Sequence, residues 1–164
     1  MSVSDWFSTF CSNLVVRNGD SISQRYKRIT GRLNKDFWDT DSDAAHSIYV
    51  GSYGRDPAIN GTSDFDMAFW LPWSKHTQYD AHQGNGQSAL LQAVRDSIEK
   101  TYRYTSLGAD GQVIVLNFDD GMQFEVLPCF EHSDGSFTHA DTNNGGSWND
   151  QGIAYLSLGL NWHW

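Results

Sequence analysis

Apolar residues recur at helical spacing in three segments of the chain. The three sets are Trp6, Phe7, Phe10, Cys11, Leu14 and Val15; Ile22, Tyr26, Ile29, Leu33 and Phe37; and Leu90, Leu91, Val94, Ile98 and Tyr102. Residues that recur every three or four positions line one side of a helix, so each set predicts an amphipathic helix. Ser4 is the predicted N-cap of the first helix, and Asn18-Gly19-Asp20 predicts a break before the second.

Four shorter segments have the apolar character of β-strands. They comprise residues 46–50, 64–71, 112–118 and 122–127. The last two are joined by Asp119-Asp120-Gly121, whose composition is typical of a hairpin turn. Residues 75–86 and 128–148 are polar and contain several glycines, which predicts loops.

The order of these elements predicts an α+β fold. Two helices come first, followed by a strand, a short helix, a strand, a helix and two strands. Such an order favours an α+β or α/β layer arrangement, in which helices pack on one side of a mixed sheet. At 164 residues the chain is most simply one domain.

Two carboxylates in the second strand segment indicate a chemical role. Asp64 and Asp66 are two positions apart, so in a strand they point the same way. Apolar residues at 65, 67, 69 and 71 then point the other way, into a core. Adjacent carboxylates repel each other unless a cation lies between them, and oxygen ligands suit Mg²⁺ or Mn²⁺.

A glycine-serine turn precedes this acidic pair by about a dozen residues. Backbone N–H groups at Gly51 and Ser52 are suited to binding a phosphate. Turn and carboxylates together indicate a site for a metal-bound nucleoside triphosphate. In the segment 122–127 the apolar residues Met122, Phe124 and Val126 face the core, and Glu125 faces the opposite way.

If the segment 122–127 lies beside the segment 64–71, Glu125 becomes a third carboxylate. Three acids can hold two divalent cations about 4 Å apart. Glu125 as an ordinary strand residue, and Asp64 and Asp66 as a solvated edge of the sheet, are the alternative interpretations.

Composition narrows the class of protein. The apolar content of 39% fits a folded globular chain, and the net charge of −9 argues against a large surface for duplex nucleic acid. Cys11 and Cys129 form neither a disulfide framework nor a metal-ligand spacing. No signal peptide or membrane span is apparent, so we expect a cytoplasmic protein without a membrane partner.

Three separated motifs carry a resemblance to a known family. They are Gly51-Ser52-Tyr53-Gly54-Arg55-Asp56-Pro57-Ala58-Ile59 followed by Ser63-Asp64-Phe65-Asp66, then Phe124-Glu125-Val126-Leu127-Pro128-Cys129-Phe130, and finally Asp141-Thr142-Asn143-Asn144-Gly145-Gly146-Ser147-Trp148. In this order they resemble the nucleotidyltransferase superfamily of the polymerase-β fold. More narrowly, they resemble the bacterial cGAS/DncV-like nucleotidyltransferases, known by their SMODS domain.

The resemblance implies a set of roles for individual residues. Asp64, Asp66 and Glu125 are the implied catalytic residues and ligands of two Mg²⁺ or Mn²⁺ ions. Residues implied to bind the nucleotide are Gly51, Ser52, Arg55, Ser63 and Trp148. Members of the family join nucleoside triphosphates into cyclic or linear oligonucleotides that act as second messengers in antiphage defence (CBASS).

The resemblance also implies a division of the chain. Residues 1–148 would form the catalytic core, and residues 149–164 an atypical tail in place of the family's usual C-terminal helical domain. The face left by that domain would favour self-association. Two further functions stay open: a minimal nucleotidyltransferase that modifies a protein or RNA partner, and an inactive nucleotide-binding remnant. Arg55 could instead pair with Asp56, and Trp148 could pack rather than stack on a base.

Overall fold

The structure of the chain, a computed structural model, describes residues 2–50 and 64–152. Within these ranges the side chains of residues 7–21 and of Asp64 lie outside the description. The elements are α1 (Val3–Phe37), β1 (Ser47–Val50), β2 (Asp64–Trp70), α3 (Trp73–Asp80), α4 (Gly86–Glu99), β3 (Ser106–Asp110), β4 (Val113–Asn117), β5 (Gln123–Glu131), β6 (Phe137–Asp141), the 3₁₀ turn η1 (Asn143–Gly145) and β7 (Ser147–Gln151).

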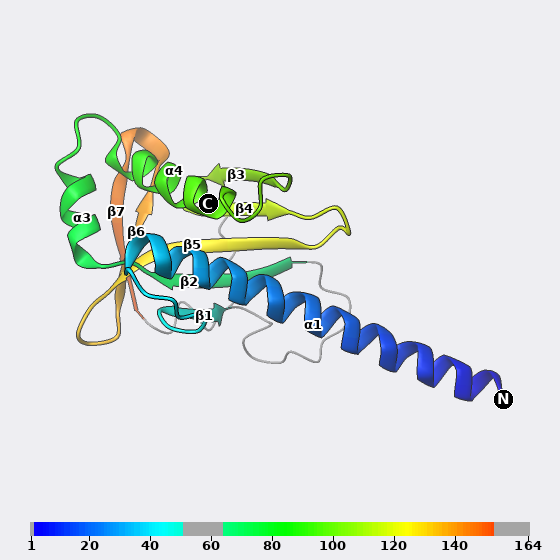
Figure 1. The fold of residues 1–164 in the computed structure, drawn as a ribbon. Helices are drawn as coiled ribbons and strands as arrows, with labels where there is room; N and C mark the ends of the chain where they lie inside the picture. The colour runs from blue at the N-terminus through cyan, green and yellow to red at the C-terminus, as the bar shows by residue number, and fades with distance from the viewer. Residues whose placement is uncertain (1, 51–63, 153–164) are drawn as a thin grey trace.

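A seven-stranded mixed sheet forms the centre of the fold (Figure 1). Five strands lie in the order β1-β2-β5-β4-β3, and β6 pairs with both β5 and β7. Strands β2 and β5 run parallel, and the other paired strands are antiparallel. Helices α1 and α4 pack on one face of the sheet, so the predicted α+β architecture with helices on one side is confirmed.

The face packed by α1 and α4, here called the covered face, holds the main core. From α1 it receives Ile22, Ile29 and Leu33; from α4, Leu90, Leu91, Val94 and Ile98; from the strands, chiefly Phe65, Met67, Phe69, Ile114, Leu116, Phe124, Val126 and Phe130. These include the predicted inward positions of β2 and β5. Alternation along the strands therefore follows the sequence pattern, since successive side chains point to opposite faces.

The predicted break in the first helix is wrong. A single helix runs from Val3 to Phe37, and Ser2 rather than Ser4 is its N-cap. The Ser2 hydroxyl accepts from the backbone N–H of Asp5 at 3.1 Å, while the Asp5 carboxylate accepts in return, which completes a capping box. A glycine inside a helix costs about 1 kcal/mol, which lowers stability without ending the helix.

Both predicted loops contain regular structure. Residues 75–86 contribute most of α3, none of whose residues is fully buried, so no apolar stripe marks it in the sequence. Residues 128–148 contribute the end of β5, all of β6 and the start of β7. Pro128 does not end β5 because β4 pairs with β5 up to Val126 and β6 begins to pair at Cys129. Proline is tolerated where no partner needs its N–H.

The N-terminal half of α1 extends beyond the sheet, away from α4 (Figure 1). Within the described residues no helix is both long and apolar enough to cross a lipid bilayer. The division of the chain at residue 148 stays a prediction, although β7 itself continues through Asn149 to Gln151.

Candidate active site

The parallel strands β2 and β5 bring two of the predicted acids together. Asp66 lies in register with Glu125, one strand away. Both positions alternate with core residues, Phe65 and Met67 on β2 and Phe124 and Val126 on β5, so both face away from α1 and α4. Because neighbouring strands lie about 4.8 Å apart, two carboxylates in this position are within reach of one cation.

Glu125 lies in a protected environment. The residue is only 9% exposed, and Gln123 Nε2 donates a hydrogen bond to Glu125 Oε1 at 3.3 Å. On the neighbouring strands, Val50 of β1 lies in register with Asp66, and Val115 of β4 lies in register with Glu125. Sequence reasoning missed the supporting role of Gln123, although its position two residues before Glu125 already placed both on one face.

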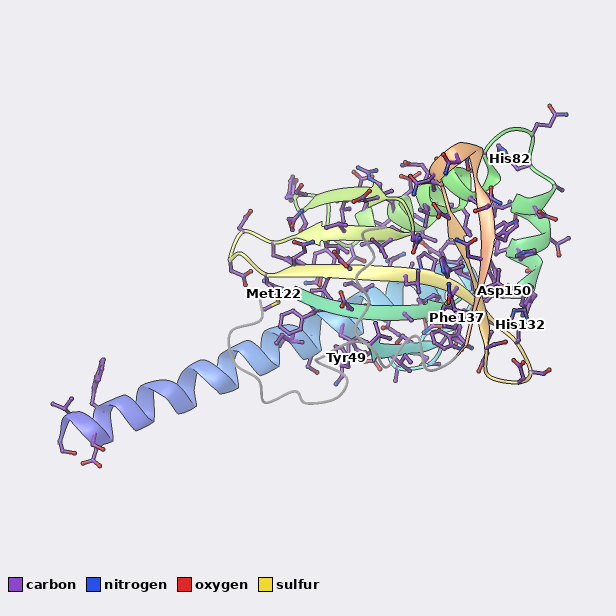
Figure 2. All side chains as sticks on the ribbon, turned by 180° about the vertical axis from the view of Figure 1, so that it is seen from behind. Tyr49, His82, Met122, His132, Phe137 and Asp150 are labelled. Atoms are coloured by element: carbon purple, nitrogen blue, oxygen red, sulfur yellow. The ribbon has the colours of Figure 1, made fainter. Side chains whose placement is uncertain are left out.

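An apolar cluster lies on the same second face of the sheet as the acidic pair. It consists of Val50, Ala68, Val113, Leu127, Cys129 and Phe137, with Trp70 and Val115 packed against it. Figure 2 shows the molecule from behind and so presents this face, with α1 and α4 on the far side of the strands and Phe137 labelled on β6. Apolar surroundings raise the cost of two adjacent negative charges and so favour a bound cation between them.

Cys129 takes no part in this chemistry. Its side chain is fully buried in the second-face cluster, and burial raises the pKa of its thiol well above the usual value. The thiol is therefore neutral at physiological pH and acts as a small apolar group.

Comparison with known proteins identifies the family. The model of the Second Messenger Oligonucleotide or Dinucleotide Synthetase domain, SMODS, matches residues 1–151. The chain belongs to the SMODS family. Among curated proteins, no sequence matches this SMODS domain.

Several solved structures share the fold of this SMODS domain. CdnC of Escherichia coli MS115-1 with ATP has a TM-score of 0.56 and 17% identity, over 87% of this chain and 43% of its own. CdnG of Bradyrhizobium diazoefficiens with GTP has a TM-score of 0.53 and 14% identity, over 85% and 38%.

The cyclic dinucleotide synthase CdnE of Elizabethkingia meningoseptica, with GTP and Apcpp, has a TM-score of 0.51 and 15% identity, over 83% of this chain and 48% of its own. The SMODS domain described here therefore spans less than half the length of each of these three proteins.

Most of the residues predicted to bind the nucleotide fall outside the described part of the SMODS domain. Gly51, Ser52, Arg55 and Ser63 all do. Asp64 occupies the register position beside Gln123, but its side chain is outside the description. Among the described side chains there is no group of three or more histidine, cysteine or acidic residues suited to a metal ion. The site with three acids and two ions stays a prediction.

Trp148 lies on the other side of the sheet. It is in register with Ala140, a covered-face residue, and its indole Nε1 donates to Asp80 Oδ1 of α3 at 2.9 Å. Its ring lies 4.4 Å from the ring of His76, measured between centroids. The structure thus does not bring Trp148 to Asp66 and Glu125; it uses this side chain to pack α3 against β7.

Proposed function

We propose that this SMODS domain is the catalytic core of a metal-dependent nucleotidyltransferase that joins nucleoside triphosphates into oligonucleotide second messengers. The observation that carries the proposal is the register of Asp66 with Glu125 on the face of the sheet opposite α1 and α4. Family membership supports the reaction class, because the matched model describes oligonucleotide or dinucleotide synthetases.

The ligands of similar structures support a substrate class for this proposal. The CdnC and CdnG structures hold ATP and GTP respectively, and the CdnE structure holds GTP with Apcpp. Nucleoside triphosphates are therefore the substrates that we propose for this chain. We further propose that it acts in the cytoplasm, in antiphage defence of the CBASS type.

The side chains at this site fit hard divalent cations. Asp66 and Glu125 supply carboxylate oxygens, the ligand type that Mg²⁺ and Mn²⁺ prefer, and Asp64 is the proposed third ligand. Two such ions, when bound, would lower the pKa of an attacking hydroxyl and neutralise charge on the phosphates. The strands contribute rigidity, since β2 and β5 are held by the core residues on their covered face.

The proposed reaction forms one bond and breaks one. A ribose hydroxyl attacks the α-phosphorus of a triphosphate, loses its proton to solvent, and displaces pyrophosphate. Positioning and charge account for most of the catalysis in such a transfer. Glu125 holds its carboxylate in place through the hydrogen bond from Gln123, and the nearby apolar residues limit access of water to that carboxylate.

A paired substitution tests this assignment. Asp66→Asn with Glu125→Gln keeps the shape of both side chains and removes both charges. We expect pyrophosphate release from α-labelled ATP and GTP, with Mg²⁺ present, to fall by at least about 10³-fold, because two of the three proposed carboxylate ligands would be lost. Thin-layer chromatography of the labelled products measures the same loss.

Glu131→Gln is the matched control. Glu131 lies on the same strand six positions further along and is exposed, so its substitution leaves the proposed site intact. Unchanged product formation in the double variant would refute the assignment. Transfer of label onto a protein or RNA, in place of a small oligonucleotide, would favour the partner-modifying function instead.

A further inference from the structure

A cavity on the covered side of the sheet has no role in the proposed reaction. Its volume is about 280 Å³, and it is lined by Gln24, Arg25, Arg28, Tyr102, Thr105 and Phe118. Tyr102 and Phe118 belong to the covered-face core, so the cavity lies on the other side of the sheet from Asp66 and Glu125. The lining residues come from α1, from the segment after α4 and from the position that follows β4.

The two arginines of this cavity differ in their partners. Arg25 is held on both sides of its guanidinium: Asp120 accepts from it at 3.2 and 2.9 Å, and the ring of Phe118 lies 3.9 Å below it. Arg28 lies 4.9 Å over the ring of Tyr102 and has no carboxylate partner among the described residues. Arg28 is an exposed residue, so its guanidinium is open to solvent and available to a ligand that enters the cavity.

Tyr102 adds an unused hydrogen-bond donor. The residue is 9% exposed, and its hydroxyl is buried without a hydrogen-bond partner in the described part of the chain. Burial raises the pKa of this phenol, and the charges of Arg28 and Arg25 partly oppose that rise. The group is therefore a neutral O–H close to two guanidinium groups. A buried donor without an acceptor is uncommon in folded proteins.

The chemistry of the lining selects one class of ligand. Guanidinium groups and the hydroxyls of Tyr102 and Thr105 all donate hydrogen bonds, and no carboxylate lines the cavity. This is unusual in a chain with a net charge of −9, where a negative surface would be expected. An oxyanion supplies both the acceptor that the Tyr102 hydroxyl lacks and the negative charge that Arg28 lacks.

We propose that this cavity is a binding site for the phosphoryl or carboxylate group of a small ligand, held by Arg28 and Tyr102. A water molecule has a share of about 30 Å³ in the liquid, so the cavity has room for an oxyanion and part of the molecule that carries it. The site is separate from the acidic pair, and its existence does not depend on the proposed nucleotidyl transfer.

Titration of the full chain with inorganic phosphate tests the proposal. Backbone amide shifts at Arg28 and Thr105 are followed by NMR in EDTA-treated buffer, with chloride adjusted to hold the ionic strength constant. EDTA removes divalent ions, so the acidic pair cannot hold phosphate through a metal. We expect a saturable shift at both residues. A parallel titration with acetate distinguishes a phosphoryl from a carboxylate preference.

Two matched pairs of variants make the result specific. Arg28→Gln should weaken binding about tenfold, because a charge-assisted hydrogen bond is lost. Lys27→Gln removes the same charge from a neighbour that is exposed like Arg28 but does not line the cavity, and it should change binding less than about twofold. Tyr102→Phe should weaken binding about fivefold. Tyr104→Phe, at a residue that is 98% exposed, should leave it unchanged.

Equal effects of Arg28→Gln and Lys27→Gln would overturn the proposal, because they would show attraction to general positive charge. Shifts that do not saturate with either anion would overturn it as well. A saturable site lost in Arg28→Gln but unaffected by Tyr102→Phe would remove Tyr102 from the proposal and so contradict it as stated.

Discussion

The two faces of the central sheet carry different kinds of side chains, although the same strands form both. On β5, Phe124 and Val126 enter a core closed by α1 and α4, while Glu125 between them points to the second face beside Asp66. The covered face is apolar where it meets the helices. The second face combines an apolar cluster with two adjacent carboxylates. The larger cluster of buried side chains lies on the covered face, so we expect that face to contribute more stability than the second face, where two adjacent charges cost stability.

The largest expected effect tests where the stability lies. Phe124 is fully buried on the covered face, so Phe124→Ala should lower the free energy of unfolding by about 3–5 kcal/mol. Val115→Ala, at a partly buried residue on the second face, should cost clearly less. Urea denaturation measures both. Equal losses would show that the two faces contribute alike and would contradict the comparison.

The next effect concerns the charges of the second face. If Asp66 and Glu125 hold metal with nucleotide, Mg²⁺ and ATP at about 100 times the dissociation constant should stabilise the wild-type chain by about 2.7 kcal/mol. Asp66→Asn with Glu125→Gln should abolish this gain, and Glu131→Gln should retain it. Thermal unfolding with and without ligand measures the difference. A gain that persists in the double variant would place the nucleotide elsewhere.

Alternation in the sequence was enough to predict both faces of β2 and β5. Phe65, Met67 and Phe69 mark one side of β2, and the pattern left Asp66 on the other. The register of Asp66 with Glu125 could only be stated as a condition. The 52 residues 71–122 separate the end of β2 from the start of β5, and parallel pairing at such a distance has no local signal in the sequence.

Elements without a buried stripe were missed for a related reason. α3 has no fully buried residue, and β3 is mostly exposed. Their positions depend on tertiary contacts, such as the hydrogen bond from Trp148 to Asp80, which joins β7 to α3. The cavity between Arg28 and Tyr102 was not predictable at all, since it unites residues far apart in the chain.

A pH titration compares the histidines associated with the two faces. His46 packs on Trp38 and its Nδ1 lies 2.6 Å from Asn34 Oδ1 of α1; burial lowers its pKa, and Glu131 opposes this weakly. His139 lies on the second face, where burial also lowers its pKa. In both cases the folded pKa is below the usual 6.5, so the unfolded chain binds more protons.

Stability should therefore be complete above about pH 6.5 and decrease as the pH falls through that value toward the folded pKa. Because His139 is 1% exposed and His46 is only partly buried, His139→Gln should remove more of this slope than His46→Gln. Urea denaturation from neutral to mildly acidic pH measures the slope. A steeper slope in either variant than in the wild-type chain would contradict the assignment.

The smallest expected effect concerns a buried polar group on the covered side of the sheet. The buried Tyr102 hydroxyl lacks a partner in the described chain, so Tyr102→Phe should raise the free energy of unfolding by about 1 kcal/mol in the absence of ligand. Tyr104→Phe, at an exposed neighbour whose hydroxyl is hydrated in both states, should change nothing measurable.

Saturating phosphate should cancel most of the difference in stability between these two variants, because binding that is about fivefold tighter is worth about 1 kcal/mol. It stabilises chains that keep the Tyr102 hydroxyl, because an anion that binds the folded state shifts the equilibrium toward it. A Tyr102→Phe chain that is less stable than the wild type without any anion would mean that the hydroxyl already has a partner. The covered face would then be purely structural, and the second face would be the side of this sheet that binds ligands.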